Sequence, residues 1–318
     1  MIKIKKQRGI ALFITLLVVT IATLLATEIW FRNTLDIART QNNRSAYQSN
    51  LYAKGMVLWA KDVLRMDFEE NSAVDTNDEA WNQTIAGIQT QDATLSGKLT
   101  DLSAKFNLNN LLINGQVHAA SYQYFLRILE KLQMDVSLAD KIIDWMDADN
   151  IPRPNGAEDA VYLSKNPAYR SASQALFDIT ELRLIDGVDE KTYQRLKNFV
   201  TVTAVIGNRP SKLNVNTAST LLLLAIDDKI QKKDALLLYQ DGHAAYQTLQ
   251  EFFQQPAIQF YNLNAENQLD ELFDVKSQWF QAQVMVQMEQ FIYTKYALLF
   301  RGNSAIALVR QYSEVPFD

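Results

Sequence analysis

The chain opens with a long run of apolar positions. Residues 10–27 carry no charged side chain, and apart from Glu28 the apolar stretch continues to residue 31. A helix that crosses a bilayer needs about 20 such residues, so this segment predicts a membrane-spanning helix. The stretch is longer than the core of a secretory signal peptide, and no Ala-x-Ala cleavage pattern follows it.

The helical pattern continues beyond the apolar run. Residues 32–66 contain no proline and a single glycine. One face of this segment repeats apolar side chains at Ala53, Val57, Ala60 and Leu64. A continuous helix over residues 10–66 would be roughly 85 Å long, and the alternative is a break near residues 42–43. Either arrangement leaves an apolar stripe that another part of the protein must cover.

The rest of the pattern divides into loop, helical and strand regions. Residues 67–94 are acidic and lack apolar periodicity, which predicts a solvated loop, and a short strand signal follows at residues 95–106. Near the C-terminus, residues 281–288, 291–300 and 305–312 are apolar-rich runs, which is typical of an antiparallel meander with one face on a core. The region between reads as helical, so we expect an insertion between the long helix and its sheet.

The helical region contains two copies of a short pattern. Residues 105–110 read KFNLNN and residues 212–217 read KLNVNT, each followed by apolar positions. Asn110 and Thr217 are suitable helix N-caps, so we expect two similar helical units. Between the copies, residues 177–196 resemble the helix-hairpin-helix of sterile-alpha-motif-like (SAM-like) folds. Because acidic residues flank the hairpin glycine, we interpret this unit as a packing element rather than a DNA-binding one.

Composition favours an exported, membrane-tethered globular protein. The chain has 318 residues, 48% of them hydrophobic, which is enough for one large domain or two modest ones. Its net charge of -5 becomes -9 without the four basic side chains of residues 1–9, and such acidity excludes ordinary nucleic-acid binding. Cysteine is absent, which excludes disulfides and thiol chemistry. No catalytic motif occurs and neither histidine has a triad pattern, so we predict a protein that is not an enzyme.

The most distinctive chemical pattern is an acidic segment at residues 144–159. A helix predicted to begin at Ser137 ends within this segment, where the helix dipole disfavours anions. The candidate metal ligands are Asp144, Asp147, Asp149, Glu158 and Asp159, with Asp186 or Asp189 as further candidates. Crowded carboxylates need a counter-charge, and calcium, which takes about six to eight oxygen ligands, would supply it. The alternative is a solvated acidic loop with Arg153 as its ionic partner.

The N-terminal leader leaves two possibilities open. Basic side chains precede Gly9, and the apolar run begins directly at Ile10. An uncleaved leader would make an ordinary single-span anchor with its basic end in the cytoplasm. The pattern also resembles the class III leader of type IV pilins and pseudopilins, in which a prepilin peptidase cuts after the glycine and the new N-terminus is methylated. That resemblance makes Gly9 and Ile10 the processing residues. Most of the family has Glu at the fifth mature position, where this chain has Ile14, which suits a terminal subunit.

Together these motifs resemble the K-type minor pseudopilins of the bacterial type II secretion system. The resemblance covers nearly the whole chain and rests on the long apolar helix, Ile14, the two repeated segments and residues 152–159 (PRPNGAED). It implies an α+β, pilin-like fold with a long N-terminal helix on an antiparallel sheet and a large inserted α-helical, SAM-like domain. It further implies calcium binding, association with I-type and J-type minor pseudopilins, and a role at the pseudopilus tip, initiating or capping assembly for the export of folded proteins.

The resemblance also sets an expected organisation. The segments are a cleaved leader (1–9), the transmembrane part of the helix (10–31), the first part of the pilin-like domain (32–104), the inserted helical domain (105–275) and the C-terminal strands (276–318). We expect a single-pass protein of the bacterial inner membrane with its C-terminal domain in the periplasm, meeting the prepilin peptidase and the inner-membrane assembly platform. The alternative is a membrane-anchored, calcium-binding periplasmic enzyme or receptor.

Overall fold

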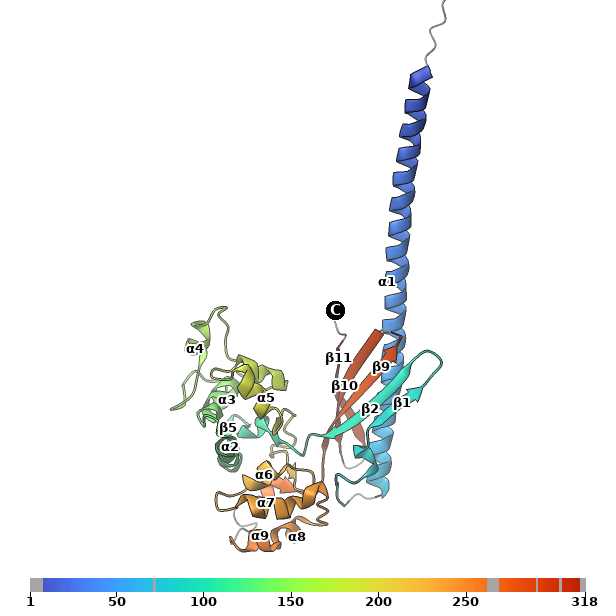
Figure 1. Cartoon of the computed structure of the whole chain (residues 1–318). Coiled ribbons are helices and arrows are strands. Elements are labelled where there is room, and N and C mark those ends of the chain that lie inside the picture. The colour runs from blue at the N-terminus through green and yellow to red at the C-terminus, as the bar shows by residue number, and fades with distance from the viewer. Residues whose placement is uncertain (1–7, 71–72, 262–268, 290, 303–304, 315–318) are drawn as a thin grey trace, which may run out of the picture.

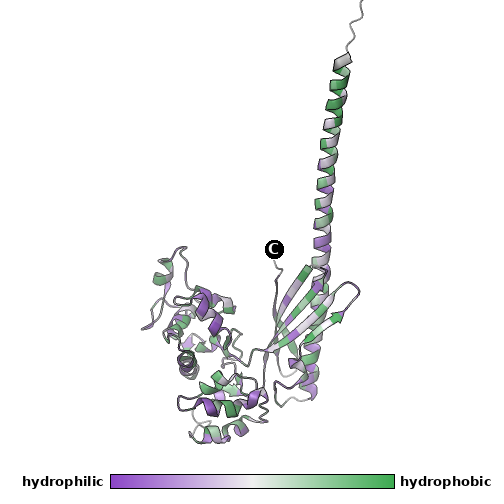
Figure 2. Cartoon of the chain, viewed as in Figure 1, coloured by the Kyte–Doolittle hydropathy of each residue, from purple (hydrophilic) through white to green (hydrophobic). Residues whose placement is uncertain are grey.

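One helix dominates the computed structural model, which describes residues 8–70, 73–261, 269–289, 291–302 and 305–314 (Figure 1). Helix α1 (Arg8–Glu70) runs for 63 residues without interruption, so the continuous helix is confirmed and a break near residues 42–43 is not. Its first half is exposed and strongly apolar (Figure 2). By length and composition this helix could cross a membrane. Residues 1–7 of the predicted leader lie outside the described residues.

The last third of α1 packs on a five-stranded antiparallel sheet. In the order of the sheet, the strands are β1 (Ile85–Gln89), β2 (Thr94–Asp101), β9 (Trp279–Met288), β10 (Phe291–Arg301) and β11 (Ile306–Glu314). The predicted stripe that includes Ala53 and Leu64 is buried against alternate residues of β9 and β10, such as Val284 and Ala297. Strand alternation explains this contact, because every second side chain points to the helix.

The predicted solvated loop at residues 67–94 is wrong in part. Residues 85–89 of this segment form β1, and Val74, Asp75 and Trp81 are buried. Four of the five side chains of β1 are exposed. The strand is therefore held by main-chain pairing with β2 at the sheet edge, which leaves no alternating apolar pattern to detect.

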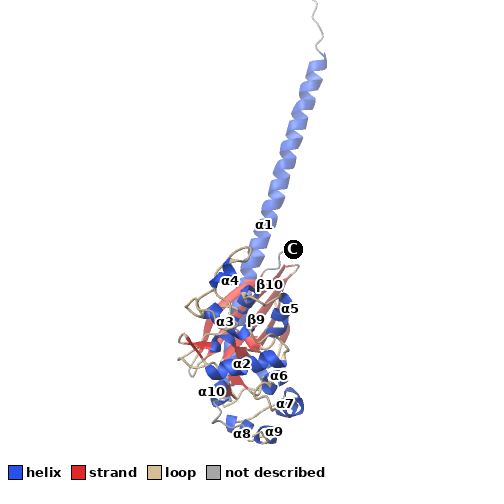
Figure 3. Cartoon of the chain, turned by 90° about the vertical axis from the view of Figure 1, so that its left-hand side faces the viewer, coloured by secondary structure: helices blue, strands red, loops and turns tan. Residues whose placement is uncertain are grey.

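A helical region with its own apolar core lies between β2 and β9 in sequence and beside the sheet in space (Figures 1 and 3). Its helices are α2 (Ala119–Lys131), α3 (Leu138–Met146), α4 (Asp159–Leu163), α5 (Glu190–Leu196), α6 (Thr220–Leu224), α7 (Lys232–Tyr239), α8 (Leu249–Phe253), α9 (Pro256–Gln259) and α10 (Leu269–Leu272), with 3-10 segments η2 (Leu108–Leu111), η3 (Ile179–Leu184) and η4 (Gln240–Gly242). A further 3-10 segment, η1 (Ala80–Asn82), precedes β1 and belongs to the sheet part of the molecule. Short strands are β3 (Phe106–Asn107), β4 (Leu112–Ile113), β5 (Gln116–Val117), β6 (Val200–Thr201), β7 (Leu213–Asn214) and β8 (Phe273–Asp274).

The two repeated segments adopt the same local structure, as the sequence predicts. Strand β3 pairs in parallel with β6, and β7 pairs in parallel with β8. In each copy the first asparagine accepts a hydrogen bond from the backbone two residues on, Asn107 from Asn109 and Asn214 from Asn216.

The predicted N-caps of these units are wrong. Asn107 caps η2, while Asn110 instead accepts from the backbone N–H of Ser211 and donates to its carbonyl. Ser219 occupies the N-cap position of α6, and the Thr217 hydroxyl donates to Asp101. These polar side chains bind distant loops, which a local capping rule does not anticipate.

Candidate metal centre

The end of α3 and the start of α4 bring acidic side chains together. Helix α3 begins after Ser137, as predicted, and carries Asp144 in its last turn, with Asp147 at its C-cap. The chain then turns back so that Glu158 occupies the N-cap position of α4. One carboxylate oxygen from each of Asp144, Asp147 and Glu158 lies within 4.8 Å of the other two.

Four oxygens of these carboxylates lack a hydrogen-bond partner in the described part of the chain. Asp144 Oδ1, Asp147 Oδ1 and both oxygens of Glu158 are buried and accept no hydrogen bond. Burial, reinforced by the neighbouring carboxylates, raises the pKa of Glu158 to about 7 and that of Asp147 to about 6. A group of buried, unpaired carboxylates is costly unless a cation neutralises it. The arrangement therefore fits a hard cation with oxygen ligands.

Arg153, the ionic partner in the alternative interpretation, makes its ion pair outside this group, although its charge partly offsets the raised pKa values of Asp144 and Asp147. Its Nε donates to Asp140 Oδ1 at 2.7 Å, and its guanidinium lies over the Tyr122 ring. Only its backbone N–H reaches the group, donating to Asp144 Oδ2 at 3.1 Å.

The other predicted ligands lie outside the carboxylate group. Asp149 is exposed and accepts from the backbone N–H of Ile151. Asp159 accepts from Ser171 and pairs with Arg170, and the backbone N–H of Ser171 is the main reason that its pKa is lowered. The two further candidates also have other roles. Asp186 pairs with Lys141 and Lys165, and Asp189 caps α5.

Gly156 is a residue of this centre that the sequence analysis missed. A Cβ atom at this position would lie 1.7 Å from Asp144 Oδ2, so only glycine lets the returning loop close over the carboxylate. The Pro-Asn-Gly turn is visible in the sequence, but the close approach to Asp144 is not.

We expect Gly156→Ala to destabilise the folded protein by about 1–3 kcal/mol, because the added methyl group must displace the Asp144 carboxylate. The measurement is thermal unfolding of the full chain in detergent. Gly55→Ala is the matched control, since a Cβ at Gly55 meets nothing within 4 Å and alanine favours a helix. Equal melting temperatures for Gly156→Ala and wild type would contradict this account.

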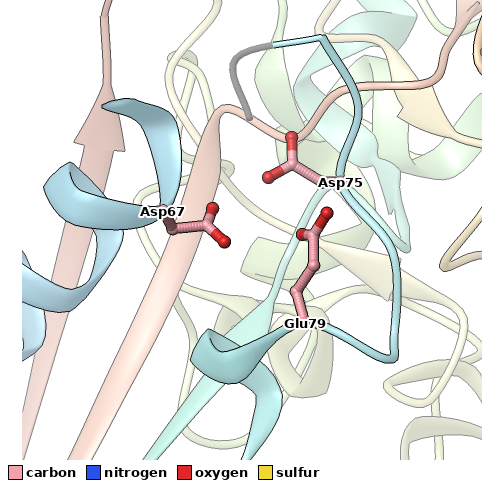
Figure 4. Close-up of side chains that lie close together, drawn as sticks. All are labelled: Asp67, Asp75 and Glu79. Atoms are coloured by element: carbon pink, nitrogen blue, oxygen red, sulfur yellow. The ribbon is translucent and has the colours of Figure 1, made fainter. Parts of the chain in front are cut away.

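A second acidic group lies at the end of α1 and has its own cation. Asp67, Asp75 and Glu79 converge from α1, the following loop and the start of η1 (Figure 4). Arg301, at the end of β10, is buried and pairs with Asp67 at 3.1 Å and with Asp75. Glu79 accepts from the Trp81 indole at 2.7 Å. Because these groups have protein partners, we assign this cluster to the structure and not to a metal.

Comparisons with known proteins agree with this organisation. A family model described as "Type II secretion system (T2SS), protein K" matches residues 104–205. Type II secretion system protein K of Pseudomonas aeruginosa is 36% identical over 231 residues, covering 69% of this chain and 68% of that protein. Its counterpart in Klebsiella pneumoniae is 31% identical over 267 residues, covering 80% and 81%. The chain belongs to the type II secretion system protein K family.

A solved structure has the same fold as this chain. A chain in the crystal structure of the GspK–GspI–GspJ complex from enterotoxigenic Escherichia coli superimposes with a TM-score of 0.76 at 22% identity. The match covers 87% of this chain and 100% of that chain. The predicted α+β fold, with a long helix on an antiparallel sheet and an additional helical region, is thus confirmed.

Proposed function

We propose that this protein K is a minor pseudopilin at the tip of the type II secretion pseudopilus, where it initiates or caps assembly for the export of folded proteins across the outer membrane. The observation that carries the proposal is α1, whose residues 10–31 are exposed and apolar while its last third packs on the sheet. A helical insertion larger than the sheet domain lies beside it, where its bulk would oppose stacking of a further subunit. The proposed role is structural, with no catalysis.

The proposed partners follow from the same fold. The similar chain was solved in a complex with GspI and GspJ, so we assign I-type and J-type minor pseudopilins as partners. The prepilin peptidase and the inner-membrane assembly platform are the further partners. The apolar residues 10–31 and the basic leader support a location in the inner membrane as a single span, with the C-terminal domain in the periplasm. An apolar Ile14, exposed on α1, enters the membrane without the cost of a carboxylate and suits the terminal subunit.

The proposed cofactor is calcium, held by Asp144, Asp147 and Glu158. Their unpartnered oxygens support this assignment, because a hard cation would satisfy all of them. Bound calcium would neutralise the group and fasten the loop between α3 and α4. Asp149 and Asp159 were predicted as ligands, but their own contacts make them poorer candidates.

Processing at Gly9–Ile10 is the direct test of the pseudopilin role. We expect the intact mass of the membrane-extracted protein to correspond to loss of residues 1–9 plus one methyl group. In cells that lack the prepilin peptidase, the full-length mass should remain. An uncut N-terminus in both strains would contradict the proposal and favour the membrane-anchored enzyme or receptor.

A further inference from the structure

A cavity of about 500 Å³ lies between the helical insertion and the sheet. Its walls are mainly apolar and include Leu112, Leu176, Val202, Leu298 and Val309. The first three come from the insertion, and Leu298 and Val309 come from β10 and β11. None of the proposed calcium ligands lines it, so this cavity is separate from the acidic centre. Its size and apolar character are typical of a site that receives an apolar group.

Two hydrogen-bond donors in the cavity wall have no acceptor among the described residues. Thr203 is only 3% exposed, and its backbone is fully bonded to Asn107 and Asn109, but its hydroxyl has no partner. Arg310 uses its terminal nitrogens for the Phe177 carbonyl and for Asp178, while its buried Nε has no partner. Buried donors are rarely left unsatisfied. Both donors are therefore available to the oxygen acceptors of a bound group.

The free edge of β11 borders this cavity. Strand β11 is the last strand of the sheet and pairs only with β10. Within its described residues, every side chain from 307 to 314 except Arg310 is exposed, including Leu308 at 41% and Val309 at 50%. The strand contains no proline or lysine; its protection against pairing is limited to the charges of Arg310 and Glu314 and to a bulge at Val309, where its register with β10 shifts. Such an edge can accept a further strand through main-chain hydrogen bonds.

We propose that the cavity and the free edge of β11 together form a docking site for an extended, apolar segment of a partner polypeptide. The segment adds as a strand beside β11, places an apolar side chain in the cavity and offers carbonyl or carboxylate oxygens to Thr203 and Arg310. The occupant is a strand because Val309 and Arg310 belong to both the edge and the cavity wall. This inference is independent of calcium and of the place of the protein in the pseudopilus.

The test uses the full chain in detergent and a phage-displayed library of random peptides of nine residues, the length of β11. We expect selection of apolar peptides that protect the amides of β11 from hydrogen exchange. Thr203→Val should bind these peptides about fivefold more weakly, since it loses one hydrogen bond. It should melt no lower than wild type, because the hydroxyl it removes has no partner in the fold.

Ser219→Ala is the matched control. It also removes a buried hydroxyl without a partner, but Ser219 does not line this cavity, so peptide affinity should not change. Failure to select any peptide would overturn the proposal, as would equal affinity for Thr203→Val and wild type, or binding without protection of β11. A dimer of the chain that Leu308→Lys dissociates would identify a second copy as the occupant and would equally overturn it.

Discussion

Calcium should raise the free energy of unfolding of the chelated protein by about 3 kcal/mol when its free concentration is about 100 times the dissociation constant. The reason is that Asp144, Asp147 and Glu158 present oxygens that have no other partner in the part of the chain that the structure describes. The unfolded chain separates them and binds calcium poorly. Thermal unfolding of the full chain in detergent, with a chelator or with millimolar calcium, measures the effect.

Charge-removing variants should give opposite results in the two conditions. Without calcium, Glu158→Gln should be more stable than wild type, because it removes one of several mutually repelling buried charges. Calcium should stabilise this variant much less than it stabilises wild type, because the substitution removes one of the ligands. Asp149→Asn is the matched control and should keep the calcium response, since Asp149 is exposed and lies outside the group. Equal melting temperatures of wild type with chelator and with calcium would contradict calcium binding at this site.

The response should also depend on pH. Folding raises the pKa of Glu158 from 4.5 to about 7 and that of Asp147 from 3.8 to about 6. Between the unfolded and the folded pKa values, the calcium-free folded protein binds more protons than the unfolded chain. Its free energy of unfolding therefore falls as pH rises through this range. Calcium requires the ionised carboxylates, so its stabilisation should be complete above about pH 7 and lost as pH falls through 6. A calcium response that grows on acidification would contradict the assignment.

Local patterns predicted the parts of this fold that depend on neighbouring residues. Periodicity located α1 and the stripe that includes Ala53 and Leu64, and the repeated K-φ-N-φ-N pattern, in which φ is an apolar residue, identified two similar units. The ligand group was predicted only in outline. Glu158 and Asp159 are adjacent, yet only Glu158 faces Asp144, because Asp159 starts α4 and is bound by Ser171. Which of two neighbouring acids faces inward depends on the path of the loop, which residue spacing does not determine.

Contacts between distant segments were not predictable from one sequence. Arg301 and Asp75 are separated by 226 positions, and nothing near either residue indicates the other. The acidic loop pattern at residues 67–94 suggested solvation, but burial of Asp75 becomes tolerable only because Arg301 reaches it. The unpartnered Thr203 hydroxyl is likewise visible only after the chain is folded.

Replacing Arg301 should be among the most damaging single changes in the chain. Arg301→Met should reduce the free energy of unfolding by about 3–5 kcal/mol, because removing one partner of a buried ion pair leaves uncompensated charges. Asp67 and Asp75 would both lose their cation. Two hydrogen bonds to the Ser277 carbonyl would also be lost. Denaturant unfolding of the full chain in detergent measures the loss at neutral pH.

The surroundings of Arg301 suggest that the loss concentrates at the joint between the sheet and the helical insertion. Asp75 also accepts from the Ser277 backbone, and the Ser277 hydroxyl donates to Asp101, which in turn accepts from Thr217 of the insertion. Hydrogen exchange should therefore rise first around Ser277 and Thr217. Arg65→Met is the matched control, because the Arg65 ion pairs with Asp62 and Glu69 are exposed and exposed ion pairs contribute little to stability.

Acidification should partly rescue Arg301→Met. Burial, followed by the charges of Glu79 and Asp75, already raises the pKa of Asp67 to about 7, and loss of the guanidinium would raise it further. Near pH 5 the carboxyl is then neutral in the folded state, so the penalty of an unpaired buried charge is reduced. The difference in free energy of unfolding between Arg301→Met and wild type should therefore be smaller at low pH. Adding Asp67→Asn to Arg301→Met should reproduce that rescue at neutral pH. A loss that is small, independent of pH and equal to that of Arg65→Met would show that the carboxylates do not depend on Arg301.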